Sequence, residues 1–194
     1  MPIRRGDLNP ATVVAMAILV ASLLAQTIDP ELLDALRRDP AALADGQWWR
    51  VATPLLVQEA GPLSALILII FLGWLGTTLE PVIGSLAVAA LLLVGAVTGE
   101  LGGYAWHPFG AGSSVAIAGL VGALPILFAE RANPLGIEPR ARRLALVGAG
   151  AILFGAVALC AVADLHGPPI LAGALTYLGL RRLHPAVAIP SAGA

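Results

Sequence analysis

The sequence predicts an all-α membrane protein in which six helices cross the bilayer, and three observations support this prediction. Apolar residues make up 58% of the 194 residues, and the mean hydropathy is +0.88, whereas soluble domains contain about 45–50% apolar residues. The apolar residues gather into six long segments. The arginines lie mainly in those connections between segments that would share one face of a membrane, as expected for cytoplasmic loops.

The six segments cover approximately residues 11–28, 62–79, 86–104, 114–128, 144–163 and 168–180. A bilayer core requires about 20 helical residues, so the fourth and sixth segments depend on flanking residues or on burial among their neighbours. Six helices and their connections use most of the chain. We therefore expect one domain over residues 1–194, with a short cytoplasmic N-terminus and a loose tail at 185–194.

The basic residues predict the orientation of the helices. Eight arginines fall on one side of a six-span protein: Arg4, Arg5, Arg131, Arg140, Arg142, Arg143, Arg181 and Arg182. Arg37, Arg38 and Arg50 fall on the other side. Arginine-rich loops stay in the cytoplasm, so we expect both termini on the cytoplasmic side of a bacterial plasma membrane. The net charge of −1 gives no reason to expect a nucleic acid partner.

The first outer loop, residues 29–61, is long and is expected to lie partly in the membrane. Asp29 can cap a short interfacial helix, Pro30 suits its first position, and three leucines give the helix an apolar side. The pair Asp39-Pro40 is expected to end this helix. Trp48-Trp49 follows, with indole rings of the kind that settle at the level of the lipid headgroups.

Ser114 and His166 are the candidate functional residues. Each stands at the start of an apolar segment, 52 residues apart, and the arginine pattern places both at the outer face. A serine and a histidine that meet there can act as nucleophile and general base. A plainer role stays open for each, because serines commonly pack between membrane helices and histidines at a membrane boundary are commonly solvated.

The start of the fourth segment offers more than a hydroxyl group. Backbone N–H groups at a helix start are unpaired, so those of Gly112, Ser113 and Ser114 can stabilise an oxyanion. Ser113 becomes the reactive residue if the helix begins one position earlier, but the spacing to Gly119 favours Ser114. His107 is close in sequence, and we expect it to be interfacial rather than the base.

Small residues provide a way to bring the pair together. Gly119 and Gly122 lie on the fourth segment and Gly173 on the sixth, and such residues let membrane helices approach closely. If these faces meet, a neutral imidazole at His166 can accept the serine proton. Asp164 has two open interpretations, as the cap of the sixth helix or as an orienting partner of the imidazole.

Four groups of residues, in order along the chain, resemble motifs of the rhomboid family of intramembrane serine proteases. The groups are Trp49-Arg50, Gly76 with Glu80, Gly112-Ser113-Ser114 with Gly119, and His166 with Gly173. They resemble, in this order, the Trp-Arg motif of the first loop, the Gly-x-x-x-Glu end of helix two, the Gly-x-Ser opening of helix four and the histidine–glycine pattern of helix six.

The resemblance implies a function and a set of roles. A rhomboid protease hydrolyses a peptide bond of a membrane-spanning substrate near the outer leaflet, with Ser114 as nucleophile and His166 as general base. Trp49 and Arg50 then anchor the first loop, and Glu80 is structural. The resemblance implies no metal, cofactor or nucleotide. The implied partners are a transmembrane substrate or partner helix and the lipid bilayer.

The sequence departs from the family pattern in helix two. Ser64 and Leu68 occupy the positions of a His-x-x-x-Asn element that assists the oxyanion, and leucine donates no hydrogen bond. Loss of one such donor costs about 10²–10³ in rate. Two alternatives therefore stay open beside the protease. One is a catalytically weak or inactive rhomboid-like pseudoprotease that binds membrane helices; the other is an unrelated six-helix transporter subunit or scaffold.

Overall fold

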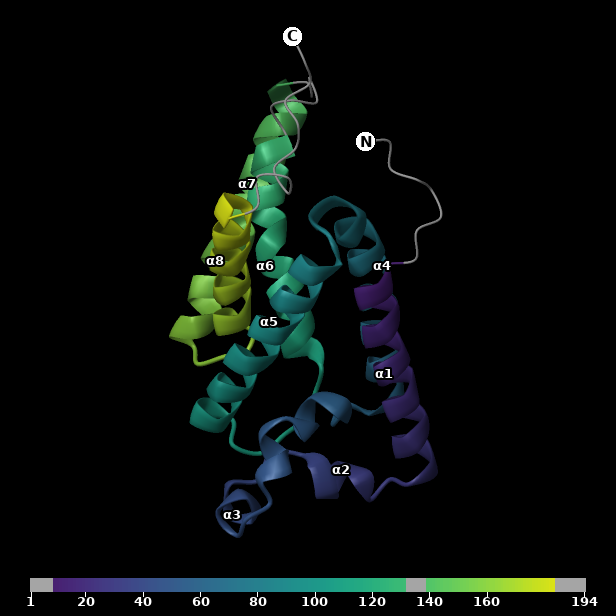
Figure 1. Ribbon diagram of the computed structural model, residues 1–194. Coiled ribbons are helices and arrows are strands. Elements are labelled where there is room, and N and C mark those ends of the chain that lie inside the picture. Colours follow the sequence, from purple (N-terminus) through teal and green to yellow (C-terminus); the bar gives the residue numbers. More distant parts are fainter. Residues whose placement is uncertain (1–8, 132–138, 184–194) are drawn as a thin grey trace.

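The computed structural model describes residues 9–131 and 139–183, and this part of the chain is helical with short connections (Figure 1). Its long helices are α1 (Pro10–Ile28), α4 (Gly61–Ile83), α5 (Ser85–Trp106), α6 (Ser114–Arg131), α7 (Pro139–Ala161) and α8 (Gly167–Leu183). Each corresponds to one predicted segment, so the predicted all-α bundle is confirmed. Arg4, Arg5 and the predicted tail at 185–194 lie outside the described residues.

Four of these helices, α1, α4, α5 and α7, are long and apolar enough to cross a membrane by length and composition. Helix α6 contains a shorter apolar stretch, Ser114–Glu130. It compensates by burial, because Leu120 and Ala123 are fully inaccessible to solvent. The expectation that the fourth segment depends on its neighbours therefore fits the packing.

Helix α5 runs through the middle of the molecule and contacts both α6 and α8. In Figure 1, α1 and α4 form one side of the bundle and α7 and α8 the other. The buried core joins α4, α5, α6 and α8 through Leu75, Leu91, Leu120 and Tyr177, among others. The residues carrying the candidate chemistry stand where α6 and α8 begin, at the edge of this core.

The two ends of the bundle differ in charge. Helix α7 begins with Arg140, Arg142 and Arg143, and α8 ends with Arg181 and Arg182. These helix ends lie opposite the short helices of the first loop (Figure 1), where Arg37, Arg38 and Arg50 are found. The predicted separation of the arginines thus holds for the described residues. The cytoplasmic location of the richer end stays a prediction.

The first loop contains more turns than the sequence predicts. Helix α2 (Leu32–Leu36) begins after Glu31, and the Asp29 carboxylate accepts the Glu31 N–H at 3.1 Å without capping the helix. The predicted cap at Asp29 is therefore wrong by two residues. Asp39 does not end this helix but caps the next one, α3 (Pro40–Ala44), by accepting two backbone N–H groups. Proline at position 40 keeps Asp39 extended, which breaks the helical run.

Two short 3-10 helices, η1 (Trp48–Val51) and η2 (Thr53–Leu56), carry the loop back to α4. The join between α1 and α4 at the other end depends on Glu80, which is 3% exposed. Its carboxylate accepts the N–H groups of Ala11 at 2.9 Å and Thr12 at 2.8 Å and the Thr12 hydroxyl at 2.6 Å. A carboxylate at a helix N-terminus satisfies unpaired donors, so Glu80 has a structural contact, as the family resemblance implies.

Candidate functional site

Ser114 is the first residue of α6, and the backbone before it is held in place by the first loop. The Ser113 carbonyl accepts the N–H of Ala116 at 3.1 Å, which starts the helix. Gly112 N–H donates to the Pro54 carbonyl at 2.9 Å, so this group, one of three considered for an oxyanion, is already bonded. Gly110 has φ of +138°, a conformation that favours glycine. The glycines before Ser114 thus shape the turn into α6.

His166 stands directly before α8, in a tight turn that follows α7. Ala163 has φ of +59°, and its N–H donates to the Cys160 carbonyl at 3.1 Å. Asp164 N–H donates to the Leu159 carbonyl at 2.9 Å, which completes a Schellman-type helix end. Helix α8 starts at Gly167, and the two prolines after it fall in the first turn, where no N–H is needed. His166 is therefore fixed by the turn rather than lying inside the helix.

The structure brings Ser114 and His166 into contact. Ser114 Oγ lies 2.9 Å from His166 Nε2, within the range for a nucleophile and its base. On the other side of the ring, His166 Nδ1 lies 2.8 Å from Asp164 Oδ1. An ionised carboxylate only accepts hydrogen bonds, so Nδ1 carries the proton in the neutral imidazole. Nε2 then accepts the hydrogen bond of the Ser114 hydroxyl.

The glycines predicted to pack helices together lie directly beneath this contact. A Cβ atom added at Gly173 would overlap the Gly119 carbonyl, and one added at Gly122 would overlap the Ile170 carbonyl. Helices α6 and α8 therefore approach until their backbones touch. This close approach holds the starts of both helices, and so Ser114 and His166, at a fixed separation.

Asp164 also holds the backbone of His166. Its Oδ1 atom accepts the His166 N–H at 2.8 Å. This backbone hydrogen bond, with the side-chain hydrogen bond and charge of His166, lowers the pKa of Asp164 from its ordinary 3.8, although partial burial opposes the shift. The carboxyl group is thus ionised at neutral pH, as the imidazole tautomer described above requires.

A polar pocket of about 230 Å³ lies in front of the Ser114–His166 contact. Its lining comprises Arg38, Glu59, His107, Phe109, Gly110, Ala111, Gly112, Ser114, Leu165 and His166. The described structure has no hydrogen bond between His107 and Ser114; His107 Nε2 donates to the Ala163 carbonyl at 3.1 Å. His107 is exposed, and its place at the membrane interface stays a prediction. The pocket leaves the Ser114 hydroxyl open to a ligand.

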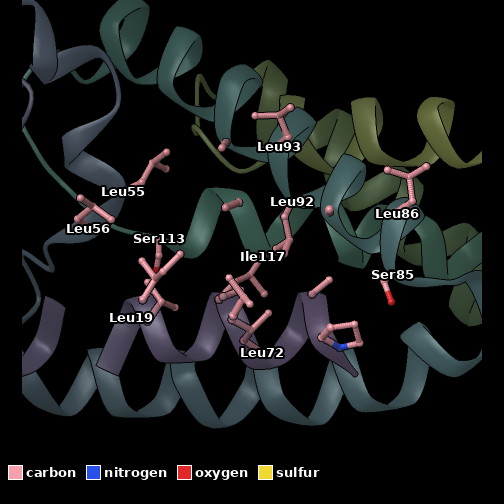
Figure 2. A pocket seen from close by; sticks show the side chains of 18 residues that line it. Leu19, Leu55, Leu56, Leu72, Ser85, Leu86, Leu92, Leu93, Ser113 and Ile117 are labelled. Atoms are coloured by element: carbon pink, nitrogen blue, oxygen red, sulfur yellow. The ribbon is translucent and has the colours of Figure 1, made fainter. Parts of the chain in front are cut away.

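Ser113 faces a different environment. Its hydroxyl oxygen accepts a hydrogen bond from Gln58 Nε2 at 2.8 Å, and the residue is 3% exposed. Ser113 also lines a larger cavity of about 730 Å³ between α1 and α5, whose other walls are almost entirely apolar (Figure 2). Neither Ser114 nor His166 lines that cavity. The larger cavity is therefore not the candidate active site, and the geometry favours Ser114 over Ser113 as the nucleophile.

A buried ion pair beside the pocket was not anticipated from the sequence. Arg38 Nη1 lies 3.0 Å from Glu100 Oε1, and both side chains are buried. Arg38 Nε donates to the His107 carbonyl at 3.3 Å, and Arg38 N–H donates to the Gly110 carbonyl at 2.9 Å. Arg38 thereby ties the first loop to the turn before Ser114. Glu100 is the residue in the sequence that indicates such an ion pair, because a carboxylate inside an apolar segment needs a partner.

The predicted loop anchors, Trp49 and Arg50, differ in their contacts. Arg50 is 6% exposed, and its Nη1 donates to the carbonyls of Asp34 at 2.9 Å and Arg37 at 2.8 Å. The Tyr104 hydroxyl donates to the Arg50 carbonyl at 2.8 Å, which links the loop to α5. Trp49 is 40% exposed and donates to the Ala35 carbonyl at 3.4 Å. Arg50 therefore makes the stronger anchor.

The helix-two positions that depart from the family pattern do not reach the polar pocket. Leu68 packs against the apolar core, and neither Ser64 nor Leu68 lines the pocket. Within residues 9–131 and 139–183, no three His, Cys, Asp or Glu side chains lie close enough to hold a metal ion. The side chains that meet at the Ser114–His166 contact are a serine, a histidine and the carboxylate of Asp164.

The fold and the site define an integral membrane protein with a serine–histidine contact at one end of a helical bundle. The model of the Rhomboid domain matches residues 45–165, more than half of the chain. The chain belongs to the rhomboid family. The match includes Ser114 and ends one residue before His166, so the place of the histidine depends on the geometry.

A curated relative carries a similar segment. The rhomboid protease GluP of Bacillus subtilis (strain 168) is 32% identical over 88 residues, which are 45% of this chain. The match spans 17% of the length of that protein. Family membership supports a function of the intramembrane protease or pseudoprotease kind. The choice between the two depends on the site.

Proposed function

We propose that this protein is an intramembrane serine endopeptidase with Ser114 as the nucleophile and His166 as the general base. The observation that carries the proposal is the 2.9 Å contact between Ser114 Oγ and His166 Nε2. It forms across two helices from positions 52 residues apart, at the side of a pocket that leaves the hydroxyl accessible. Membership of a family that includes a protein named as a protease also supports it.

The chemistry follows from the hydrogen bonds. Ser114 Oγ attacks the carbonyl carbon of the scissile bond while Nε2 of His166 accepts the hydroxyl proton. The tetrahedral oxyanion lies near the start of α6, where the Ser114 N–H can donate to it. The imidazolium then gives its proton to the leaving amine. A water molecule, activated by the same imidazole, hydrolyses the acyl-enzyme and restores the serine.

The proposed substrate is a membrane-spanning protein that is cut near the outer face, in a bacterial plasma membrane. The pocket lies at the end of the bundle opposite the arginine-rich helix ends, and the positive-inside rule assigns that end to the outside. A substrate helix from the bilayer and the surrounding lipid are the proposed partners. The proposed reaction uses no cofactor, metal or nucleotide, because the serine and histidine supply both the nucleophile and the base.

A second candidate function, a pseudoprotease that binds membrane helices, is favoured by one observation. Leu68 stands where the family pattern has a side-chain donor to the oxyanion, and Gly112 N–H already donates to Pro54. Fewer donors than usual therefore face the oxyanion. Loss of one such donor costs about 10²–10³ in rate, which lowers the activity without abolishing it. The protease is therefore the better-supported function.

A fluorophosphonate probe tests the proposal because it modifies only an activated serine. We expect the purified protein in detergent to be labelled, and Ser114→Ala and His166→Ala each to lose labelling by at least about 100-fold. Ser113→Ala is the matched control. It removes the neighbouring hydroxyl, which contacts Gln58 rather than His166, and should keep the wild-type labelling rate.

Two outcomes would contradict this proposal. Labelling that persists in Ser114→Ala, or that is lost in Ser113→Ala while both variants stay folded, assigns the nucleophile to a different residue. Absence of labelling in a folded wild-type protein favours the pseudoprotease. That function then predicts that transmembrane peptides bind the wild type and Ser114→Ala with equal affinity.

A further inference from the structure

We propose that Asp164 is a positioning residue that orients the imidazole of His166 and stabilises its protonated form. The site then operates as a Ser114–His166–Asp164 triad. The inference rests on the proposed function, because it assigns a role within the same reaction. Its basis is the pair of contacts on opposite sides of one imidazole ring, 2.8 Å from Nδ1 to Asp164 Oδ1 and 2.9 Å from Nε2 to Ser114 Oγ.

The carboxylate selects the tautomer that the base needs. A neutral imidazole carries one proton, and only the nitrogen without it can accept the proton of a serine. Asp164 accepts from Nδ1 and so holds the proton there, which leaves the Nε2 lone pair directed at Ser114. Without the carboxylate, the Nε2–H tautomer is also available, and that form cannot act as the base toward Ser114.

The carboxylate also stabilises the charge that forms during the reaction. When Nε2 takes the proton of Ser114, the ring becomes an imidazolium, and the negative charge 2.8 Å from Nδ1 favours this state. Leu68 occupies the position of a side-chain oxyanion donor in the family pattern, and leucine donates no hydrogen bond. Asp164 therefore contributes on the base side of a reaction whose oxyanion side is short of donors.

The turn between α7 and α8 is built so that Asp164 reaches the ring. The left-handed residue Ala163 ends α7 and turns the chain, and the Asp164 carboxylate then bridges to the N–H of His166 at 2.8 Å. His107 clamps the same turn by donating to the Ala163 carbonyl at 3.1 Å. Both the backbone and the ring of His166 thus depend on one carboxylate oxygen, which restricts the rotation of the imidazole.

A purely structural role for Asp164 predicts a different response to mutation. Asparagine keeps the side-chain carbonyl that accepts a backbone N–H two residues later, because Asp and Asn both form such turns. Asparagine removes the charge, and its amide can also donate. Asp164→Asn therefore tests the charge of the carboxylate, because its Oδ1 can still accept from the His166 N–H and from Nδ1–H, while Asp164→Ala removes both contacts.

We expect Asp164→Asn to fold normally but to react with the fluorophosphonate probe about 10- to 100-fold more slowly than wild type, and Asp164→Ala to be at least as slow. The expected loss is smaller than the about 10⁴-fold loss for a buried triad aspartate, because the side chains of Asp164 and His166 are each 39% exposed and water replaces part of the interaction. Asp29→Asn is the matched control, since the Asp29 carboxylate also accepts an N–H two residues later, at 3.1 Å. This control should react at the wild-type rate.

A spectroscopic measurement decides the role even in the absence of hydrolysis. The ¹⁵N chemical shifts of His166, assigned by comparison with His166→Ala, should show Nδ1 protonated in the wild type. In Asp164→Ala, which lacks the acceptor for Nδ1–H, they should show a mixture of the two tautomers. A wild-type reaction rate in Asp164→Asn, or unchanged tautomers in Asp164→Ala, would overturn the role of Asp164. If the wild type itself fails to react, the proposed protease fails, and the ¹⁵N shifts still test the Asp164–His166 contact.

Discussion

Two adjacent hydroxyl groups, at Ser113 and Ser114, point into different environments because they stand where α6 begins. Successive residues of a helix are rotated by about 100° around its axis, so one hydroxyl meets Gln58 and the other meets His166. The buried one is bonded and enclosed, whereas the other borders a polar pocket. The direction of a single side chain thus determines which serine can react.

The lowered pKa of Asp164 predicts a dependence of stability on pH. A carboxyl group with a lower pKa in the folded protein stabilises the fold above its ordinary pKa, and this contribution is lost as the pH falls through the folded value. For Asp164 the ordinary value is 3.8, and the shift is downward because His166 donates hydrogen bonds to it. The stabilisation is therefore complete at neutral pH and disappears in acid below that value.

We expect the apparent melting temperature in detergent to fall between about pH 5 and about pH 2 more steeply for the wild type than for Asp164→Asn. Other carboxyl groups titrate in both proteins, so the difference between the two curves isolates Asp164. The two proteins should converge in stability at the acid end. Parallel curves over the whole range would show that the folded protein does not favour the ionised form of Asp164.

At the level of single residues, the sequence indicates the chemistry but not all of its partners. Ser114 and His166 can be proposed from their positions at the starts of apolar segments, and the structure places them in contact. Asp164 has two interpretations in the sequence because the start of α8 is ambiguous beside two prolines. The sequence alone does not show whether Arg37 or Arg38 pairs with Glu100, because the choice depends on how the first loop folds; in the structure the partner is Arg38.

Helices α6 and α8 pack so closely that backbone atoms meet at glycine positions. The Gly119 and Gly173 backbones meet, and Gly122 lies against the backbone of Ile170 and Ala174. Backbone atoms cannot move aside as a flexible side chain can. The contact between Ser114 and His166 therefore depends on positions that carry no functional group themselves.

We expect Gly122→Ala to lower the free energy of unfolding by about 1–3 kcal/mol, the usual cost of overpacking, and to slow probe labelling of Ser114. The added Cβ would lie 2.8 Å from Ala174 N and overlap the Ile170 carbonyl, so α8 must move away. Unfolding in mixed detergent micelles, followed by circular dichroism, measures the stability.

Gly148→Ala provides the matched control for this prediction. The substitution is the same, but a Cβ at Gly148 on α7 meets nothing within 4 Å. We expect its stability to be unchanged or higher by up to about 1 kcal/mol, because alanine favours a helix more than glycine does, with unchanged labelling. If both alanine variants behave alike, close backbone packing of α6 and α8 does not hold the site together.

The first loop shows where prediction of elements fails. The tryptophans and prolines indicate a partly embedded, irregular segment, but Arg38 pairs its backbone with Gly110 and its side chain with Glu100. These contacts join residues more than 60 positions apart and keep Arg38 from continuing α2. Local propensity contains no information about such partners, so α2 ends at Leu36, before the predicted end at Asp39-Pro40, and α3 was not predicted.

At the scale of the whole molecule, six apolar segments are enough to predict six helices, because a bilayer leaves the backbone few other choices. Hydropathy does not indicate which helices touch. The central place of α5 depends on the close packing of Gly95 and Gly99 against the start of α6. Small residues are recognisable in a sequence, but their partners become known only when the helices are placed in space.

The distribution of arginines predicts the orientation of the protein in the membrane, and this orientation determines which face carries the Ser114–His166 pocket. In a bacterial host, with Cys160→Ala as the background to remove the single native cysteine, we expect Asp45→Cys in the first loop to react with a membrane-impermeant maleimide in intact cells. Ala141→Cys, beside the arginines that begin α7, should react only after the membrane is opened. Both positions are exposed, so accessibility within the fold does not decide the outcome. The reverse pattern would place the Ser114–His166 pocket at the cytoplasmic face, and cleavage near the outer leaflet would then be impossible whatever the reactivity of the serine.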